Sequence, residues 1–291
     1  MNKSSRILVI GASGFVGRQL LNDWGNYALG THWRTPCKET VYFDPLTMHL
    51  QGIPGIRDCS HAVILYGERE PDICWSRPQY TYQLNVESTK RVIRQCSDLG
   101  IVPVFASSEM VFSGNRGMYG ESDIPDPILM YGKYKVEIEK FLADTSDNYF
   151  IIRLSKVMGT TRNDRSIFSN WLAQVEEGKA EVIRCAQDQH FSLIAVTDVS
   201  KLLDSLFATG KTGTYHFSDG LRHNRIDLLK ILLSSLECSI SEKIRIAPVS
   251  INDFGSPELR PQDLSMSSSN LSVITSFRFA SPSDCVRELL S

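Results

Sequence analysis

The 291-residue sequence lacks any hydrophobic run near the ~20 residues that a membrane-spanning helix needs. Only a few apolar residues precede Gly11, too few for the core of a signal peptide. Its formal net charge of −2 also lacks the basic surplus of proteins that bind phosphate backbones. We therefore expect a cytoplasmic protein that binds neither membranes nor nucleic acid.

The sequence also lacks the cysteine and histidine patterns of disulfide-bonded or metal-binding proteins. Its seven cysteines are scattered, with no Cys-x-x-Cys spacing, and an odd number would leave one unpaired. The histidines show no metal-ligand spacing, so we expect reduced thiols and no metal site. Hydrophobic residues at 42% and charged residues at 22% are those of an ordinary soluble protein, so the chain can bury a large core.

What the sequence does contain is a glycine-rich turn after its first apolar run. Residues 6–10 are typical of a strand buried on both faces of a parallel sheet, and a helical pattern covers residues 15–24. Backbone amides at the start of such a helix can receive a pyrophosphate. We therefore expect a dinucleotide here, with a tight turn without ligand as the alternative. The expected contact residues are Gly11, Ser13, Gly14, Phe15, Val16 and Gly17.

Later strands predict the rest of the cofactor site. A second strand at 27–33 is followed by Arg34, where many dinucleotide sites place an acid for the ribose; an arginine suits a 2′-phosphate and indicates NADP. The alternative is a solvated arginine. Asp44 ends a short third strand, where it could accept a hydrogen bond from adenine. A fourth strand ends in Leu65-Tyr66-Gly67, where the nicotinamide would pass.

A reaction centre is predicted between residues 107 and 135. The fifth apolar run, 102–106, leads into Ser108, and ligands of open parallel sheets bind at strand carboxyl ends. Tyr131 and Lys135 are four residues apart, so on a helix they share one face. An ammonium beside a phenol lowers the phenol pKa toward neutrality, and Tyr131 could then protonate a carbonyl oxygen that Ser108 also holds. The alternative is a surface helix with an ordinary tyrosine.

The order of these patterns predicts an α/β protein. Alternating strands and helices up to a sixth run at 150–154 favour a Rossmann-type doubly wound parallel sheet over residues 1–158. Residues 159–291 are mixed, and we expect mainly a smaller mixed α/β substrate-binding cap with segments returning to the Rossmann domain. Helices are expected near 166–177, 198–208, 225–236 and from 283, and strands at 181–185, 214–217 and 244–249. A long helical pattern at 77–96 contains Asn85, a polar amide that is more often structural than catalytic.

Taken together, these motifs resemble the extended short-chain dehydrogenase/reductase superfamily, and within it the dTDP-4-dehydrorhamnose reductase family. Residues 107–114, Ser-Ser-Glu-Met-Val-Phe-Ser-Gly, are similar to that family's Ser-Thr-Asp-Tyr-Val-Phe-x-Gly. Residues 131–135, Tyr-Gly-Lys-Tyr-Lys, are similar to its Tyr-Gly-Lys-x-Lys. The likeness covers nearly the whole chain.

This resemblance implies a function and a set of roles. The chain would use NADP(H) to reduce a keto group on a nucleotide-activated deoxysugar, its sugar-nucleotide substrate. Ser108 and Tyr131 would polarise and protonate the carbonyl, and Lys135 would hold the nicotinamide ribose and lower the tyrosine pKa. Asn85 would anchor a water relay behind Lys135.

Three residues depart from the family pattern on the expected substrate side. Glu109 replaces Asp, Met110 replaces Tyr, and Lys156 replaces Trp, so we expect Glu109 and Lys156 to contact the substrate and to set its identity. The substrate would then carry an acidic or amino-substituted sugar; the alternative is that the two residues pair with each other. Two other functions stay open: an epimerase or dehydratase with bound NAD, against which Arg34 counts, and a non-catalytic NADP-binding regulatory subunit. The oligomeric state is not fixed by the sequence, and a homodimer is retained as one alternative.

Overall fold

Seven parallel strands form the central sheet, in the order β11-β6-β5-β4-β1-β2-β3. The structure is a computed structural model and describes residues 5–176 and 181–291. The strands are β1 (Arg6–Ile10), β2 (Ala28–His32), β3 (Thr40–Tyr42), β4 (Cys59–Ile64), β5 (Val102–Ser108), β6 (Phe150–Leu154) and β11 (Gly213–Phe217). In the sheet, β2 lies on one side of β1 and β3 lies beyond β2. The chain then crosses back, so that β4 lies on the other side of β1. The strand ends beside β1 are therefore the topological switch point, where open sheets bind ligands.

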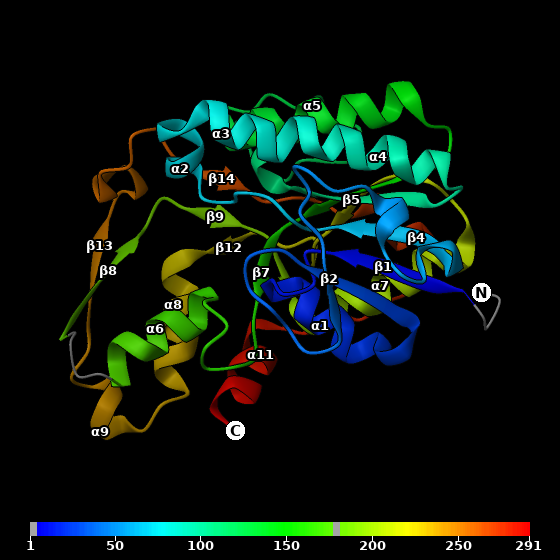
Figure 1. The fold of residues 1–291 in the computed structure, drawn as a ribbon. Coiled ribbons are helices and arrows are strands. Elements are labelled where there is room, and N and C mark those ends of the chain that lie inside the picture. The colour runs from blue at the N-terminus through cyan, green and yellow to red at the C-terminus, as the bar shows by residue number, and fades with distance from the viewer. Residues whose placement is uncertain (1–4, 177–180) are drawn as a thin grey trace.

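Helices cover both faces of this sheet (Figure 1). On one face α1 (Phe15–Trp24) packs beside α7 (Val196–Thr209), over a core that includes Val9, Leu20 and Leu202. The other face carries α4 (Ser88–Asp98) and α5 (Met130–Thr145), with Leu8, Ile93 and Ile138 in its core. The apolar run of β1 is buried on both faces because it lies between these two layers. The predicted Rossmann-type doubly wound sheet is confirmed.

The helix expected over residues 77–96 is interrupted in the structure. It consists of α3 (Pro78–Tyr82), a π-helical turn η4 (Gln83–Glu87) and α4, and a short α2 (Pro71–Ser76) precedes it. Asn85 lies in the π-helical turn, a feature that often marks functional sites. The second strand also begins one residue later than expected, because residues 25–27 form a 3₁₀ turn.

Smaller paired strands and several helices form the cap, much of which lies at the left of Figure 1. The strand pairs are β7 (Lys156–Met158) with β10 (Leu193–Ala195) and β8 (Val182–Ala186) with β13 (Arg245–Val249), and β9 (His190–Phe191) lies between β12 (His223–Asn224) and β14 (Asp263–Leu264). The helices are α6 (Ile167–Glu176), α8 (Arg225–Ser234), α9 (Cys238–Ser241) and α11 (Pro282–Leu290). Their core includes Phe168, Trp171 and Leu229. Residue 177, the expected end of the helix at 166–177, lies outside the described residues.

Several segments beyond residue 158 belong to the main sheet and its layers. Strand β11 pairs with β6, α7 packs on the sheet, and α10 (Ser269–Ile274) adds Leu271 to the same core. The strand expected at 214–217 is thus the seventh strand of the central sheet. No helix within the described ranges is long and apolar enough to cross a membrane.

Candidate active site

The glycine turn after β1 is closely packed. Gly11 has φ +91°, and a Cβ on it would lie 2.9 Å from the backbone nitrogen of Tyr66. A Cβ on Gly17 would lie 2.6 Å from the carbonyl oxygen of Gly11, so only glycine lets α1 approach the turn. Among the residues that the structure describes, no side chain caps the start of α1 at Gly14, so its first amides are available to an anion. The turn therefore fits a dinucleotide pyrophosphate.

The expected nicotinamide end meets three of the expected catalytic residues, Asn85, Tyr131 and Lys135, in one cavity. This cavity, of about 40 Å³, is lined by Leu65, Tyr66, Gly67, Glu68, Arg69, Asn85, Thr89, Phe105, Tyr131, Tyr134 and Lys135. The first three residues follow β4, which is adjacent to β1 in the sheet. Residues distant in the sequence are thus brought together at the switch point, as the motifs predicted.

Tyr131, Lys135 and Ser108 lie where α5 crosses the end of β5. Ser108 lies close enough to the Tyr131 phenol to lower its pKa, and the Ser108 Oγ accepts a 3.2 Å bond from the backbone nitrogen of Met110. The Lys135 ammonium donates a 2.7 Å bond to the carbonyl oxygen of Ala106 and lies 5.4 Å from the centre of the Tyr131 ring. The three side chains therefore share one site.

The expected lowering of the Tyr131 pKa is not found in this structure, and that prediction is wrong here. Burial raises the pKa of Tyr131, with the Cys74 thiol adding to the rise and the Arg69 guanidinium and Ser108 opposing it. Burial also lowers the pKa of Lys135 to about 8, against the field of Glu139. The spacing placed the two groups correctly, but the ammonium bonds to a strand carbonyl and burial dominates both pKa values.

Asn85 holds the loop that forms one wall of the cavity. Its Oδ1 accepts a 2.7 Å bond from the backbone nitrogen of Glu68, and its Nδ2 donates a 2.8 Å bond to the Glu68 carbonyl oxygen. Gly67, with φ +136°, fits against Asn85 because a Cβ there would lie 2.9 Å from Oδ1. The side chain thus has a structural role in the described residues, and the water relay stays a prediction.

Arg34 and Asp44 lie just beyond β2 and β3. The Arg34 guanidinium stacks 4.3 Å from the Trp33 ring centre and donates to the Tyr80 hydroxyl of α3. Asp44 accepts bonds from the backbone nitrogen of Leu46 at 2.8 Å and from a threonine hydroxyl at 2.9 Å, so it closes a turn. Both residues lie on the side of β1 where the adenosine end of a dinucleotide would extend, and their ligand contacts stay predictions.

Glu109 and Lys156 lie near each other beyond Ser108, and each shifts the pKa of the other. Glu109 is 5% exposed, and its Oε2 has no hydrogen-bond partner among the described residues. Burial raises the pKa of Glu109 to about 8, against the lowering field of Lys156. Burial likewise lowers the pKa of Lys156, which Glu109 opposes. Glu109 and Lys156 both depart from the family motifs, and each therefore counteracts the effect of burial on the pKa of the other.

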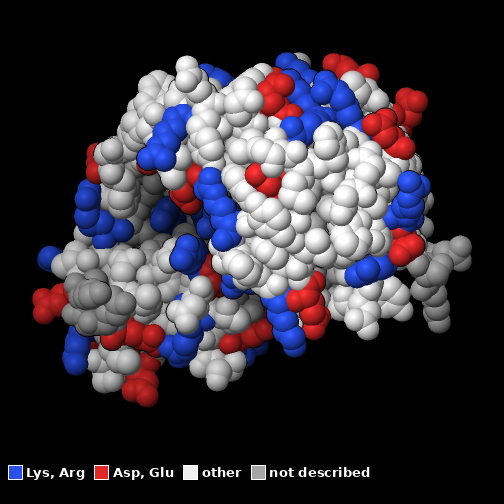
Figure 2. Space-filling view, in the orientation of Figure 1, with Lys and Arg blue, Asp and Glu red and all other residues white. Residues whose placement is uncertain are grey.

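Positively charged side chains gather along the hollow between the two lobes in Figure 2. The guanidinium groups of Arg225 and Arg69 both lower the pKa of Lys156. Basic side chains from the main sheet and from the cap therefore lie near one another. Such a field favours an anionic ligand. No group of three or more His, Cys, Asp or Glu within residues 5–176 and 181–291 could hold a metal ion.

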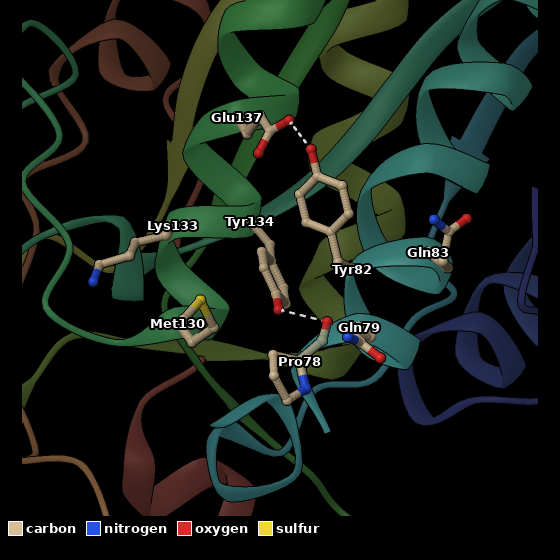
Figure 3. Close-up of a pocket in the computed structure, with 8 residues that line it drawn as sticks. All are labelled: Pro78, Gln79, Tyr82, Gln83, Met130, Lys133, Tyr134 and Glu137. Carbon is tan, nitrogen blue, oxygen red and sulfur yellow. Dashed lines mark hydrogen bonds between the residues drawn. The ribbon is translucent and has the colours of Figure 1, made fainter. Parts of the chain in front are cut away.

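A larger groove lies on the outer side of α3 and α5 and is not the reaction site (Figure 3). It has a volume of about 710 Å³ and includes Tyr82, whose hydroxyl donates a 2.8 Å bond to Glu137, and Tyr134, whose hydroxyl donates a 3.1 Å bond to the Pro78 carbonyl oxygen. Ser108, Tyr131 and Lys135 do not line it.

Sequence reasoning missed a buried polar cluster beneath the site. Glu139, Ser107 and His216 join Arg153 in it, and each is at most 5% exposed. The position of Glu139, four residues after Lys135 on the same helix, was the signal that could have identified it.

Comparisons with known proteins agree with this fold and these motifs. The model of the RmlD substrate binding domain family matches residues 5–290. Methionine adenosyltransferase 2 subunit beta of Bos taurus is 30% identical over 53% of this chain and 47% of that protein, so the chain spans about half the length of this curated relative. A probable low-salt glycan biosynthesis reductase of Haloferax volcanii is 25% identical over 72% of each chain.

Solved structures share the fold over nearly the full length. The dTDP-4-dehydrorhamnose reductase of Bacillus anthracis, solved in complex with NADP, superposes with a TM-score of 0.82 at 23% identity, covering 99% of each chain. The match of the family model to residues 5–290 confirms the resemblance that the motifs of β5 and α5 predicted: this chain belongs to the RmlD substrate binding domain family.

Proposed function

We propose that the chain is an NADPH-dependent reductase of a keto group on a nucleotide-activated sugar. The observation that carries this proposal is the convergence of Ser108, Tyr131 and Lys135 with the loop after β4 at the switch point of the sheet. The proposal is supported by the names of two similar proteins: the Haloferax volcanii relative is a probable glycan biosynthesis reductase, and the Bacillus anthracis structure is a dTDP-4-dehydrorhamnose reductase in complex with NADP.

The residues of the chain fit a dinucleotide. The crowded glycine turn and the free amides of α1 would hold the pyrophosphate, Arg34 a 2′-phosphate, and Lys135 the nicotinamide ribose. When bound, NADPH supplies a hydride to the carbonyl carbon. The Tyr131 hydroxyl donates its proton to the carbonyl oxygen and Ser108 donates a hydrogen bond to that oxygen, so the keto group becomes an alcohol as NADPH becomes NADP⁺.

We assign substrate choice to Glu109 and Lys156. Glu109 offers a buried carboxyl whose Oε2 has no hydrogen-bond partner within the described residues, and Lys156 offers a half-buried ammonium. Both groups stand where the rhamnose enzymes present an Asp and an aromatic ring. The substrate would then carry an acidic or amino substituent that these groups recognise. We expect dTDP-4-dehydrorhamnose to be reduced more slowly than the preferred substrate; equal rates would contradict an altered pocket.

The test is a screen of the purified protein with NADPH against several 4-keto sugar nucleotides. The loss of NADPH absorbance measures turnover. Stoichiometric loss with alcohol formation supports a reductase. Conversion of the sugar without net loss of NADPH would indicate the epimerase or dehydratase.

The cytoplasmic location stays a prediction. The homodimer alternative also stays a prediction, and light scattering of the purified protein checks it.

A regulatory subunit is the second candidate, favoured by the 30% identity to a methionine adenosyltransferase beta subunit. In that case NADP(H) binding would persist while every substrate of the screen stayed unreduced. Turnover that depends on Tyr131 separates the two candidates.

A further inference from the structure

Three consecutive turns of α5 present ionisable side chains to the end of the sheet. Tyr131, Lys135 and Glu139 are spaced by four residues, so they lie on one face of the helix. That face meets three successive residues of β5: Tyr131 contacts Ser108, Lys135 bonds to the Ala106 carbonyl oxygen, and Glu139 accepts a 2.5 Å bond from the Ser107 hydroxyl. Only the first two of these side chains have a role in the proposed reaction.

The Glu139 carboxylate is also the acceptor of a buried bidentate ion pair. Arg153 of β6 donates from Nη2 at 2.7 Å and from Nε at 3.0 and 3.2 Å to its two oxygens. Both side chains are at most 6% exposed. The carboxylate therefore joins α5 to two neighbouring strands, β5 and β6, directly behind the reacting face.

The ion pair extends into the segment before α10. Nδ1 of His216 lies 2.9 Å from the Ser267 carbonyl oxygen, which can only accept, so Nδ1 carries the proton. Its Nε2 is then free to accept from Arg153 Nη1 at 3.3 Å. Burial lowers the pKa of His216 to about 4, with Arg153 adding to the effect, so the ring is neutral and suited to this role.

We propose that Glu139 is a positioning residue, whose carboxylate fixes the reacting face of α5 against β5 and β6 and keeps the buried Lys135 ammonium charged. The catalytic consequence rests on the proposed function. The effect on Lys135 does not, because it follows from the charges of the chain alone.

The Lys135 ammonium needs the Glu139 charge because burial favours the neutral amine. Burial lowers its pKa to about 8, and Glu139 is the larger of the two groups that raise it, ahead of Cys74. Arg153 is not among the groups that shift it. Titratable and charged side chains surround Lys135 from three elements. They are Tyr66, Glu68 and Arg69 after β4, Cys74 of α2, and Tyr131, Tyr134 and Glu139 of α5. Without the Glu139 charge, the ammonium would lose its proton at a lower pH.

The direct test is a titration of Lys135 in the cofactor-free protein by NMR of ¹³C-lysine-labelled chain, with the Lys135 Cε signal assigned from Lys135→Arg. We expect a wild-type midpoint near pH 8. Glu139→Gln should lower it by at least about one pKa unit, the order expected when a buried opposite charge one turn away is removed. Glu139→Asp keeps the charge and should keep the midpoint within a few tenths of a unit of wild type.

Two further variants keep the test decisive. Glu139→Gln leaves Arg153 buried without a partner and is prone to unfold, so Glu139→Gln/Arg153→Met removes both charges and should still lower the midpoint. Glu137→Gln removes a carboxylate of the outer groove on the same helix and should leave it unchanged (Figure 3). A wild-type midpoint in folded Glu139→Gln, or in the double variant, would overturn the proposal. A chain without reductase activity would still show the shift, so the two proposals fail separately.

Discussion

The ammonium of Lys135 is bonded to the carbonyl oxygen of Ala106, two residues before Ser108, at 2.7 Å. An ammonium has three donors, so this bond fixes the side chain to β5 and leaves two donors for other partners. Lys135 therefore serves the proposed site from a fixed position on the strand. Because this position removes the ammonium from water, burial lowers the pKa of Lys135 to about 8.

We expect Lys135→Met to impair both cofactor binding and turnover, because methionine keeps the packing of the stem but removes the charge and all three donors. Losing hydrogen bonds to a charged group costs about 1.5–3 kcal/mol, or roughly ten- to hundredfold in NADPH affinity. Fluorescence titration of NADPH measures it. Lys133→Met, which changes an exposed lysine of the same helix that lines the outer groove (Figure 3), serves as the control. Equal NADPH affinity in wild type and Lys135→Met would remove the ribose role.

Arg34→Ala should weaken NADPH binding by roughly ten- to hundredfold, about 1.5–3 kcal/mol, and leave NADH binding nearly unchanged. The guanidinium is already oriented by Trp33 and Tyr80, so little ordering is needed when it meets a 2′-phosphate. Isothermal titration of both cofactors measures the effect, with Arg94→Ala, a surface arginine of α4 stacked on Phe141, as the control. Equal affinities of wild type for NADPH and NADH would contradict the assignment.

Much of the fold was readable from local patterns. The buried run at 6–10 and the glycine turn predicted β1 and the start of α1, because each signal lies within a few residues. The i,i+4 spacing of Tyr131 and Lys135 placed them on one face for the same reason. The spacing of residues does not reveal how deeply they are buried. Burial raises the pKa of Tyr131, whereas the spacing predicted that Lys135 would lower it.

The parts that escaped prediction depend on distant partners. Arg153 and His216 are 63 residues apart and meet only because β11 pairs with β6. Likewise, the π-helical turn at Asn85 is fixed by bonds to the backbone of Glu68, 17 residues earlier, so helical periodicity gave no sign of it.

Glu109→Gln should change how stability depends on pH. The folded pKa of Glu109 is raised from 4.5 to about 8, so the folded state holds a proton that the unfolded chain releases, and stability falls as pH rises through this range. Glutamine resembles the protonated acid and should remove part of that fall. Thermal unfolding at pH 5 and pH 8 measures it, with Glu237→Gln on the exposed cap surface as the control. An identical pH dependence in wild type and Glu109→Gln would show that Glu109 is ionised in the folded protein at both pH values.

The most direct test of the account is the reductase activity of Tyr131→Phe. Phenylalanine keeps the ring and deletes the hydroxyl that contacts Ser108, so folding and NADPH affinity should stay near wild type. General acid catalysis contributes roughly 10²–10⁴-fold, and kcat on the best keto sugar nucleotide of the screen should fall by that factor. Wild-type turnover in Tyr131→Phe would contradict the proton-donor assignment and the catalytic site built on it.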